Sequence, residues 1–173
     1  MSRGFTLIEI AVVIAIIVII TGIVIFNIGS VRQNSALLRA AQNLSLNLRQ
    51  VQNYSLSSKD FKAQGVPCGW GVHFNGLGST SYIIFADSAL SQDCSDKDSV
   101  RASDGSEDFE VVNFDAGIAI SGLSNNLSDI VFYPPEPSIV FTSDQAVASI
   151  TLINRDSSTR AITINKTGAI SSP

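Results

Sequence analysis

The sequence is poor in the residues from which catalytic and metal sites are built. Among 173 residues there is one histidine, His73, and only two cysteines, Cys68 and Cys94. A zinc site needs a second pair of ligands in addition to the two cysteines. A catalytic histidine needs a nucleophile and an orienting acid, and no such motif surrounds His73. It also lacks phosphate-binding glycine loops, nucleophile elbows and HExxH motifs. We therefore predict a protein that is not an enzyme and needs no metal or cofactor.

Positive charge is scarce as well. The chain has 11 Lys and Arg residues against 15 Asp and Glu residues, giving a formal charge of -4 and an isoelectric point near 4.8. Binding to a nucleic-acid backbone requires Lys and Arg side chains that displace its counterions. The composition therefore argues against DNA as a general partner, and any DNA contact would have to be local.

Apolar residues, in contrast, are abundant and unevenly placed. They make up 45% of the chain, with a mean hydropathy of +0.28, and the excess lies in residues 10–28, which carry no charge. Such a run can span a bilayer core as a helix. Arg3 precedes it, so the positive-inside bias predicts a single-pass inner-membrane protein with a cytoplasmic N-terminus. The extracytoplasmic remainder is of a size that suits one domain.

Glu9 does not fit a simple membrane anchor. It stands one position before the apolar run, with Leu7 and Ile8 already apolar ahead of it. Insertion would place its carboxylate in or near the bilayer, where an acid at a helix centre costs at least ~2.5 kcal/mol, and less near an end. Either Glu9 has a charged partner or it faces headgroups at the interface. An ordinary secretory signal is disfavoured, because more apolar residues follow Gly22.

The segment RGFTLIE, from Arg3 to Glu9, followed by the apolar run, resembles the prepilin signature of type IV pilins and type II secretion pseudopilins. The resemblance implies that a prepilin peptidase cuts between Gly4 and Phe5, that Phe5 becomes N-methylated, and that the helix is retained. It also implies that Glu9 pairs with the α-amino group of Phe5 on a neighbouring subunit as an inner-membrane platform assembles a filament. A buried charge with such a partner is tolerable.

The apolar run contains no proline. Many major pilins carry a proline within this helix, where the present chain has Phe26, and Gly22 weakens the helix by only ~1 kcal/mol. This difference disfavours the behaviour of a major pilin. We therefore expect a minor subunit.

After residue 30 the pattern becomes amphipathic. Apolar residues recur at three- and four-residue steps: Leu37, Leu38, Ala41, Leu44, Leu48 and Val51. This spacing predicts one continuous helix of roughly 80 Å, from about residue 5 to about residue 57, that packs one face on a sheet. We divide the chain into a leader (1–4), a transmembrane or filament-core helix (5–29), an amphipathic helix (30–57) and a β-rich domain (58–173).

Short alternating runs fill the rest of the chain. They lie at residues 70–74, 82–85, 111–114, 130–133, 139–141, 149–153, 161–164 and near 170. Turn residues such as Asn75-Gly76 and Thr167-Gly168 separate them. We predict an α+β fold in which the long N-terminal helix packs on an antiparallel sheet.

The same runs resemble, more weakly, the H-type minor pseudopilin of type II secretion and related minor pilins; the segments are GWGVHF, SYIIFAD, IVFYPP and SITLINRDSSTRAITINKTGAIS. Some minor pilins of this family bind DNA through arginines beside the last glycine. Here Gly168 is followed by Ala-Ile-Ser with no arginine, although Arg155, Arg160 and Lys166 lie nearby in the sequence. DNA is therefore not the expected partner.

Three further features have competing interpretations. We expect His73 on the exposed face of its strand and Trp70 in the core, the alternative for Trp70 being an exposed binding aromatic. Eight acids, Asp87, Asp93, Asp96, Asp98, Asp104, Glu107, Asp108 and Glu110, could supply calcium ligands. They lack the spacing of a calcium-binding loop, so we predict a solvated polar loop.

Cys68 and Cys94 both fall outside the cytoplasm under the positive-inside bias, where thiols are oxidised. We predict one disulfide that holds the acidic loop to the sheet. The alternative is two separate thiols, with Cys68 buried and Cys94 exposed. The Cα–Cα distance distinguishes them, because bridged cysteines lie about 4.4 to 6.8 Å apart.

Two functions remain open at this point. One is a structural subunit of a pilus or secretion pseudopilus. The other is a binding module at a filament tip that recognises DNA, a secreted substrate or a surface. A basic or aromatic-rich exposed loop would favour the second.

Overall fold

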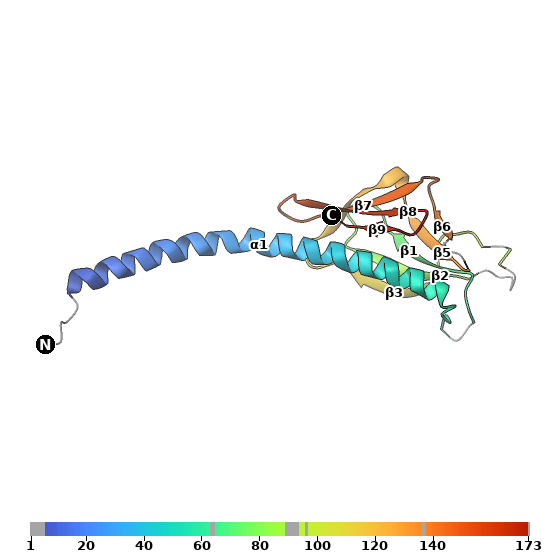
Figure 1. The fold of residues 1–173 in the computed structure, drawn as a ribbon, viewed down its shortest axis with the longest axis horizontal. Helices are drawn as coiled ribbons and strands as arrows, with labels where there is room; N and C mark the ends of the chain where they lie inside the picture. Colours follow the sequence, from blue (N-terminus) through green and yellow to red (C-terminus); the bar gives the residue numbers. More distant parts are fainter. Residues whose placement is uncertain (1–5, 63–64, 89–93, 96, 136–137, 173) are drawn as a thin grey trace.

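The structure is a computed structural model that describes residues 6–62, 65–88, 94–95, 97–135 and 138–172. Within the helix, the side chains of residues 24–28 and 30 are outside this description. A single long helix extends away from a β domain, so that half of it packs on the strands and half stands free (Figure 1).

Helix α1 runs from Leu7 to Leu56. Thr6 caps its N-terminus, and the Thr6 hydroxyl accepts a hydrogen bond from the Glu9 backbone N–H at 3.4 Å. This contact satisfies one of the donors that every helix start leaves free. At the other end the Ser57 N–H donates to the Asn53 carbonyl. The predicted helix is thus confirmed, with its described start at Leu7.

Five strands form the first sheet, in the order β3-β2-β1-β5-β6. They are β1 (Gly69–Phe74), β2 (Ser81–Asp87), β3 (Asp108–Asn113), β5 (Asp129–Tyr133) and β6 (Ser138–Phe141). All neighbours are antiparallel. Trp70, Val72 and Phe74 alternate along β1 and are buried beneath α1, as the period of two requires.

A second sheet, in the order β4-β7-β8-β9, contains β4 (Ala119–Leu123), β7 (Val147–Ile153), β8 (Thr159–Asn165) and β9 (Ile170–Ser171). A short 3-10 helix, η1 (Ser124–Asn126), follows β4. The predicted α+β fold, with the helix packed on antiparallel strands, is confirmed, and the strands divide into two sheets. Strand β4 escaped prediction because it is short, contains Gly122 and shifts register against β7 between Ile120 and Gly122.

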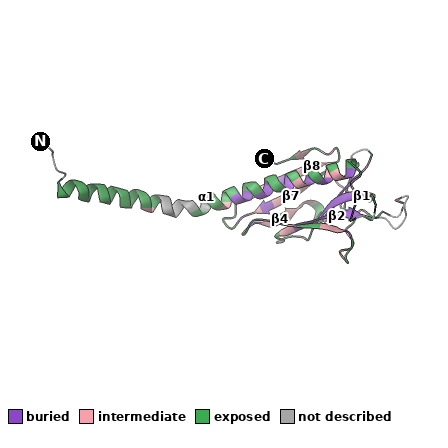
Figure 2. Ribbon diagram, turned by 90° about the horizontal axis from the view of Figure 1, so that it is seen from below, coloured by how far each residue is buried: buried purple, intermediate pink, exposed green. Residues whose placement is uncertain are grey.

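The core lies between α1 and the two sheets. Leu44, Leu48 and Val51 are fully buried in the second half of α1, against strands of both sheets. Figure 2 shows buried residues along this half and exposed residues along the first half. Only the second half of the helix is therefore covered by its own chain.

An aromatic cluster closes the core where α1 ends. Trp70 is 1% exposed, and its ring centroid lies 5.3 Å from that of Tyr54 and 5.2 Å from that of Phe109, both edge-on. The Lys59 ammonium sits 3.4 Å above the Tyr54 ring, a cation–π contact. Trp70 is thus a core anchor, as predicted, and not an exposed binding aromatic.

Candidate functional site

The first half of α1 is apolar around its whole circumference and exposed in the single chain. From Leu7 to Ile23 the large apolar side chains are at least half exposed, with 56% at Ile14, 51% at Ile16 and 64% at Ile19. A helix that is apolar on every side is normally buried in protein or lipid. An uncovered surface of this extent marks a contact site.

Glu9 lies in the first turn of this exposed segment and carries its one described charge. Its carboxylate is exposed, and its backbone N–H is bound to the Thr6 hydroxyl. An acid in the first turn is favourable toward the partial positive charge of the helix N-terminus. The carboxylate is therefore available to a cationic group from outside the chain.

Gly4 and Phe5 lie outside the described residues, so the structure does not test the predicted cleavage site. The apolar run at residues 10–28 also extends past Ile23 into side chains outside the description. Among the residues that the structure describes, no helix is long and apolar enough to cross a membrane.

Comparison with known families bears on this segment alone. Residues 1–25 match the model of the prokaryotic N-terminal methylation motif. The chain therefore begins with a type IV pilin-like prepilin signal, which indicates a pilin-like or pseudopilin-like precursor, cleavage by a prepilin peptidase, methylation and a membrane-anchored N-terminus. No curated protein and no solved structure matches the chain. The comparisons give no support to the resemblance to H-type pseudopilins.

The predicted disulfide between Cys68 and Cys94 is present in the structure. The two Cα atoms lie 5.7 Å apart, within the range for bridged cysteines. Cys68 precedes β1, and its backbone N–H donates to the Asp87 carbonyl at 2.9 Å. The bond ties Cys94 to the sheet, and the alternative of two separate thiols is wrong.

Residues 97–107, which we call the strap, follow Cys94 and contact the sheet on the face turned away from α1. A second small core of Phe85, Val131 and Tyr133 lies on that face. The Tyr133 hydroxyl donates to the Asp87 carboxylate and lies 2.8 Å from the Ser99 hydroxyl. Burial raises the pKa of Asp87 above its ordinary value, although the Tyr133 hydrogen bond opposes that shift.

Two more acids hold the strap. The Glu107 carboxylate accepts hydrogen bonds from the Ser88 N–H at 2.9 Å and the Ala102 N–H at 2.8 Å, while burial raises its pKa. Arg101 donates to Asp108, with one N–O distance of 2.7 Å. The expected solvated loop is therefore wrong for Asp87, Glu107 and Asp108, which bind the chain to itself; Asp93 and Asp96 lie outside the described residues.

His73 is not on an exposed face. Its side chain is 19% exposed, and its Nδ1 lies 2.8 Å from Oδ1 of Asp129, which is completely buried. The Ser128 hydroxyl and the Arg101 backbone N–H also donate to Asp129. Burial would raise the pKa of Asp129, but hydrogen bonds from His73 and Ser128 outweigh it and lower the pKa. Asp129, at the start of β5, thus links His73 on β1 to Arg101 in the strap.

Little in the sequence pointed to this network. Asp87 is the last residue of β2 and Asp129 is the first of β5, so each stood where a solvated strand end is the ordinary interpretation. The one usable signal was the high density of acids between residues 87 and 110. Within the described residues, no group of three or more His, Cys, Asp or Glu side chains could hold a metal ion.

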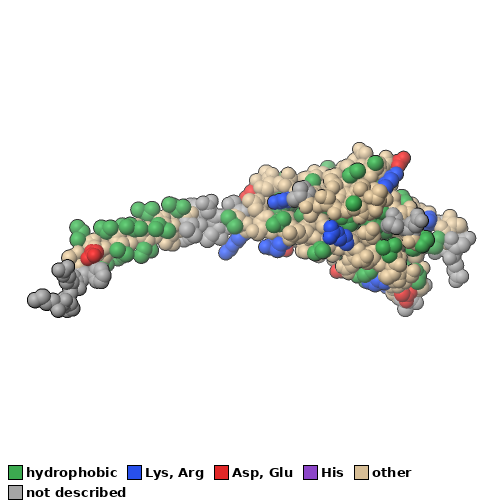
Figure 3. Space-filling model, viewed as in Figure 1, with side chains coloured by type: hydrophobic (Ala, Val, Ile, Leu, Met, Phe, Trp, Pro, Cys, Tyr) green, Lys and Arg blue, Asp and Glu red, His purple; other side chains and the backbone are tan. Residues whose placement is uncertain are grey.

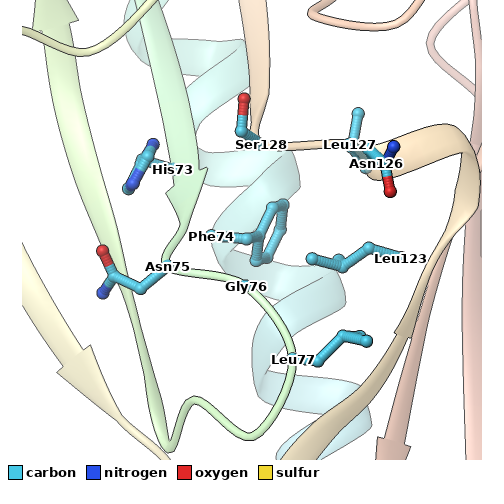
Figure 4. A pocket seen from close by; sticks show the side chains of 9 residues that line it. All are labelled: His73, Phe74, Asn75, Gly76, Leu77, Leu123, Asn126, Leu127 and Ser128. Carbon is cyan, nitrogen blue, oxygen red and sulfur yellow. The ribbon is translucent and has the colours of Figure 1, made fainter.

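A hollow of about 500 Å³ lies between the β1–β2 turn and η1. It is lined by His73, Phe74, Asn75, Gly76, Leu77, Leu123, Asn126, Leu127 and Ser128. Figure 4 shows Phe74 and Leu123 pointing toward each other across it, with His73 on the other side of β1. The Ser128 hydroxyl donates to Asp129 and Thr142, and among the described residues no hydrogen bond joins it to His73, so the hollow shows no nucleophile held by a base.

Proposed function

We propose that the chain is a structural minor pilin or pseudopilin. A prepilin peptidase cuts it between Gly4 and Phe5, Phe5 is N-methylated, and the helix holds it in the inner membrane as a single-pass protein with a cytoplasmic N-terminus. The assembly platform then moves it into a pilus or a type II secretion pseudopilus, where it packs against other subunits. Its role is mechanical, with no catalysis and no cofactor.

The exposed first half of α1 is the observation that carries this proposal. Side chains such as Ile14, Ile16 and Ile19 stay more than half exposed in the single chain, so further burial must come from lipid or from neighbouring subunits. The methylation motif at residues 1–25 supports burial first in the membrane and then among neighbouring subunits of a filament. The second half of α1 packs on strands of both sheets, which attaches the domain to the helix that would serve as the spine of a filament subunit.

Glu9 fits a role in assembly more closely than a role in anchoring. The apolar residues around it suffice to hold a helix in lipid, whereas a carboxylate there adds cost unless a cation neutralises it. The α-amino group that cleavage creates on Phe5 of a neighbouring subunit would be that cation. The tip-binding alternative has less support, because Trp70 is buried and two acids, Asp87 in β2 and Glu107 in the strap, are engaged within the chain.

Processing is tested by mass spectrometry of the mature protein from cells with a prepilin peptidase. We expect an N-terminus at methylated Phe5 and the loss of Arg3, which moves the formal charge from -4 to -5. Cells without the peptidase provide the control and should retain the full chain. An intact Met1 in the presence of the peptidase, or a cut beyond Ala11, would contradict the proposal.

Assembly is tested with Glu9→Gln and Glu9→Leu in the full chain. Both variants should be cleaved and membrane-bound like the native chain but depleted from the sheared-filament fraction, as measured by immunoblot. Asp156→Asn is the matched control, because it removes an exposed carboxylate from the β domain. Normal incorporation of the Glu9 variants would show that Glu9 is only an interfacial residue.

A further inference from the structure

One end of the β domain faces the exposed half of α1, and three segments meet there. They are residues 31–39 of α1, the turn before β4 (115–117), and the β7–β8 turn with the start of β8 (154–160). The Asn154 side chain donates to Asn34 at 3.0 Å, and Arg39 lies 3.3 Å from Asp115. These contacts place all three segments at the level where the helix enters the domain.

Positive charge predominates at this end, although the chain as a whole has a formal charge of -4. The three segments contain two acids, Asp115 and Asp156, and four arginines, Arg32, Arg39, Arg155 and Arg160. We call the four arginines the collar. Three of them, Arg32, Arg39 and Arg155, are exposed. Asp115 is already paired with Arg39, whose guanidinium has further N–H donors to offer. Figure 3 shows Lys and Arg side chains gathered where α1 meets the domain.

Collar arginines line two open hollows beside the helix. One hollow, of about 520 Å³, lies between α1 and the turn before β4, and its lining includes Arg32, Arg39 and Ala116. The other, of about 400 Å³, lies between α1 and the start of β8, and its lining includes Asn34 and Arg160. Both flanks of the helix therefore offer guanidinium groups beside space that a small anionic group could enter.

With residues 10–28 in a bilayer, helix geometry puts the collar at the membrane surface. Arg32 follows the apolar run by about one turn and Arg39 by about three. At 1.5 Å per residue their Cα atoms lie about 6 and about 16 Å beyond it, against a headgroup layer about 5 to 8 Å thick. Helical side chains lean toward the helix N-terminus, which directs both arginines back toward the membrane. Arg155 stands at the level of Asn34, because its neighbour in the chain is bonded there.

We propose that the collar docks on anionic phospholipid headgroups of the inner membrane before the chain enters a filament. The inference rests on the proposed function, because it requires the apolar run to span the bilayer. The ligand is a phosphodiester headgroup with a net negative charge, of the phosphatidylglycerol type. Docking holds the β domain against the bilayer surface, and extraction of the subunit must break this contact.

Charge and continuity favour this partner. A guanidinium group can donate two parallel hydrogen bonds to the oxygens of one phosphate. A zwitterionic headgroup also offers a phosphate, but its ammonium group would bring positive charge beside the arginines, so an anionic headgroup gains more. Val31, next to Arg32, is 62% exposed and continues the apolar surface of the first half of α1. This continuity with the membrane segment favours lipid over an acidic protein.

Photo-crosslinking in vesicles tests the contact. The full chain carries p-benzoylphenylalanine at Ala116, an exposed residue in the first hollow. The vesicles contain one phosphatidylglycerol molecule for every nine of phosphatidylethanolamine and no other protein. After irradiation, mass spectrometry should find phosphatidylglycerol in the lipid adducts at about three times its share of the vesicle lipid. The same probe at Val147, 51% exposed at the opposite end of β7 from the collar, is the matched control and should label almost no lipid.

Charge removal tests the proposed attraction. Arg32→Gln with Arg155→Gln removes two collar arginines that form no ion pair with any described residue, and the threefold enrichment should disappear. Arg49→Gln with Lys166→Gln removes equal charge far from the bilayer and should leave the enrichment unchanged. Arg49 lies roughly 30 Å beyond the apolar run, where the membrane potential is screened, and Lys166 follows the far end of β8. Denaturant unfolding of each variant checks that the domain is intact.

The outcomes separate this inference from the proposed function. If alkaline carbonate washes the full chain out of cell membranes, membrane anchoring fails, and the proposed function fails with it. If the chain is retained but the Ala116 adducts contain phosphatidylglycerol only at its share of the vesicle lipid, or contain no lipid, the docking inference alone is overturned. Equal loss of enrichment in the Arg49 and Lys166 variant also overturns it, as does an Ala116 probe that labels only protein in cells.

Discussion

The two halves of α1 have the same backbone and opposite surroundings. Ile16, in the first half, is 51% exposed, whereas Leu48, in the second, is completely buried. The first half is apolar at nearly every position, whereas in the second half polar residues interrupt an apolar stripe that recurs mainly at three- and four-residue steps. The comparison shows that helix formation and helix burial are separate properties. The period of the apolar residues decides which faces of the helix must be buried and how much of them the β domain of the same chain can bury.

The largest effect is expected where the chain covers its own helix. Leu48→Ala removes a fully buried side chain and should lower the free energy of unfolding by about 2–5 kcal/mol. Leu46→Ala, two positions away and 59% exposed, should change it by less than about 0.5 kcal/mol. Urea unfolding in detergent measures both. If both variants lost the same free energy of unfolding, the distinction between buried and exposed positions of the helix would be contradicted.

The disulfide gives the next largest effect. Cys68→Ser with Cys94→Ser opens a link between residues 26 apart, which should cost the domain about 3 kcal/mol. Far-UV circular dichroism in micelles should then show the domain and the second half of α1 melting at lower temperature, while the first half stays helical in detergent. Reducing the native protein is the control and should shift the same transition. Loss of all helicity in one step would show that the halves are coupled.

A smaller, pH-dependent effect is expected at Asp87. Because burial raises its folded pKa, the native domain loses stability as the pH rises above the ordinary value of 3.8, and Asp87→Asn removes that loss. The variant should melt a few degrees above the native chain at pH 7 and level with it near pH 3. Asp104→Asn should behave oppositely, because hydrogen bonds from Ser106 lower the folded pKa of Asp104, so its contribution is fully present above 3.8 and is lost as the pH falls through the lowered pKa. A higher melting temperature for both variants at pH 7 would contradict these assignments.

The smallest effect on stability is expected in the first half of α1. Ile16→Ala should leave the unfolding of the domain unchanged, within about 0.5 kcal/mol, because Ile16 touches no part of it. It should instead weaken retention in the membrane or filament fraction. Immunoblots of both fractions measure this, with Leu46→Ala for comparison. A change in domain stability equal to that of Leu48→Ala would refute the division of α1 into two halves.

The spacing of apolar residues predicted the helix and most of the strands, because that spacing is a property of neighbouring residues in the sequence. The helix from about residue 5 to 57 followed from uninterrupted apolar and then amphipathic spacing, and the strand containing Trp70 from its alternation. The Glu9 motif was readable for the same reason, since its seven residues are contiguous. Strand β4 was missed because a five-residue run with a glycine has almost no period to detect.

Buried polar contacts could not be predicted in the same way. Asp87 meets Tyr133, 46 positions away, and Asp129 meets His73, 56 positions away. Each acid is tolerated inside only because a distant residue donates to it, and a single sequence contains no sign of that pairing. The strap, held by such pairs, therefore looked like an ordinary charged loop.

The order in which the chain is made has a consequence for the face of α1 that the domain covers. The helix is made before every strand of the domain, and β8 and β9, which pack against it, follow the other strands in the chain. Asn34 meets Asn154 across 120 positions, and Arg49 meets Ile170 across 121. Contacts of such separation form late, because the intervening chain must first be closed into a loop. Leu44 and Leu48, which pack against strands of both sheets, thus keep part of their surface uncovered until β8 and β9 have been made, and a chain that stops before these strands leaves that part open to aggregation.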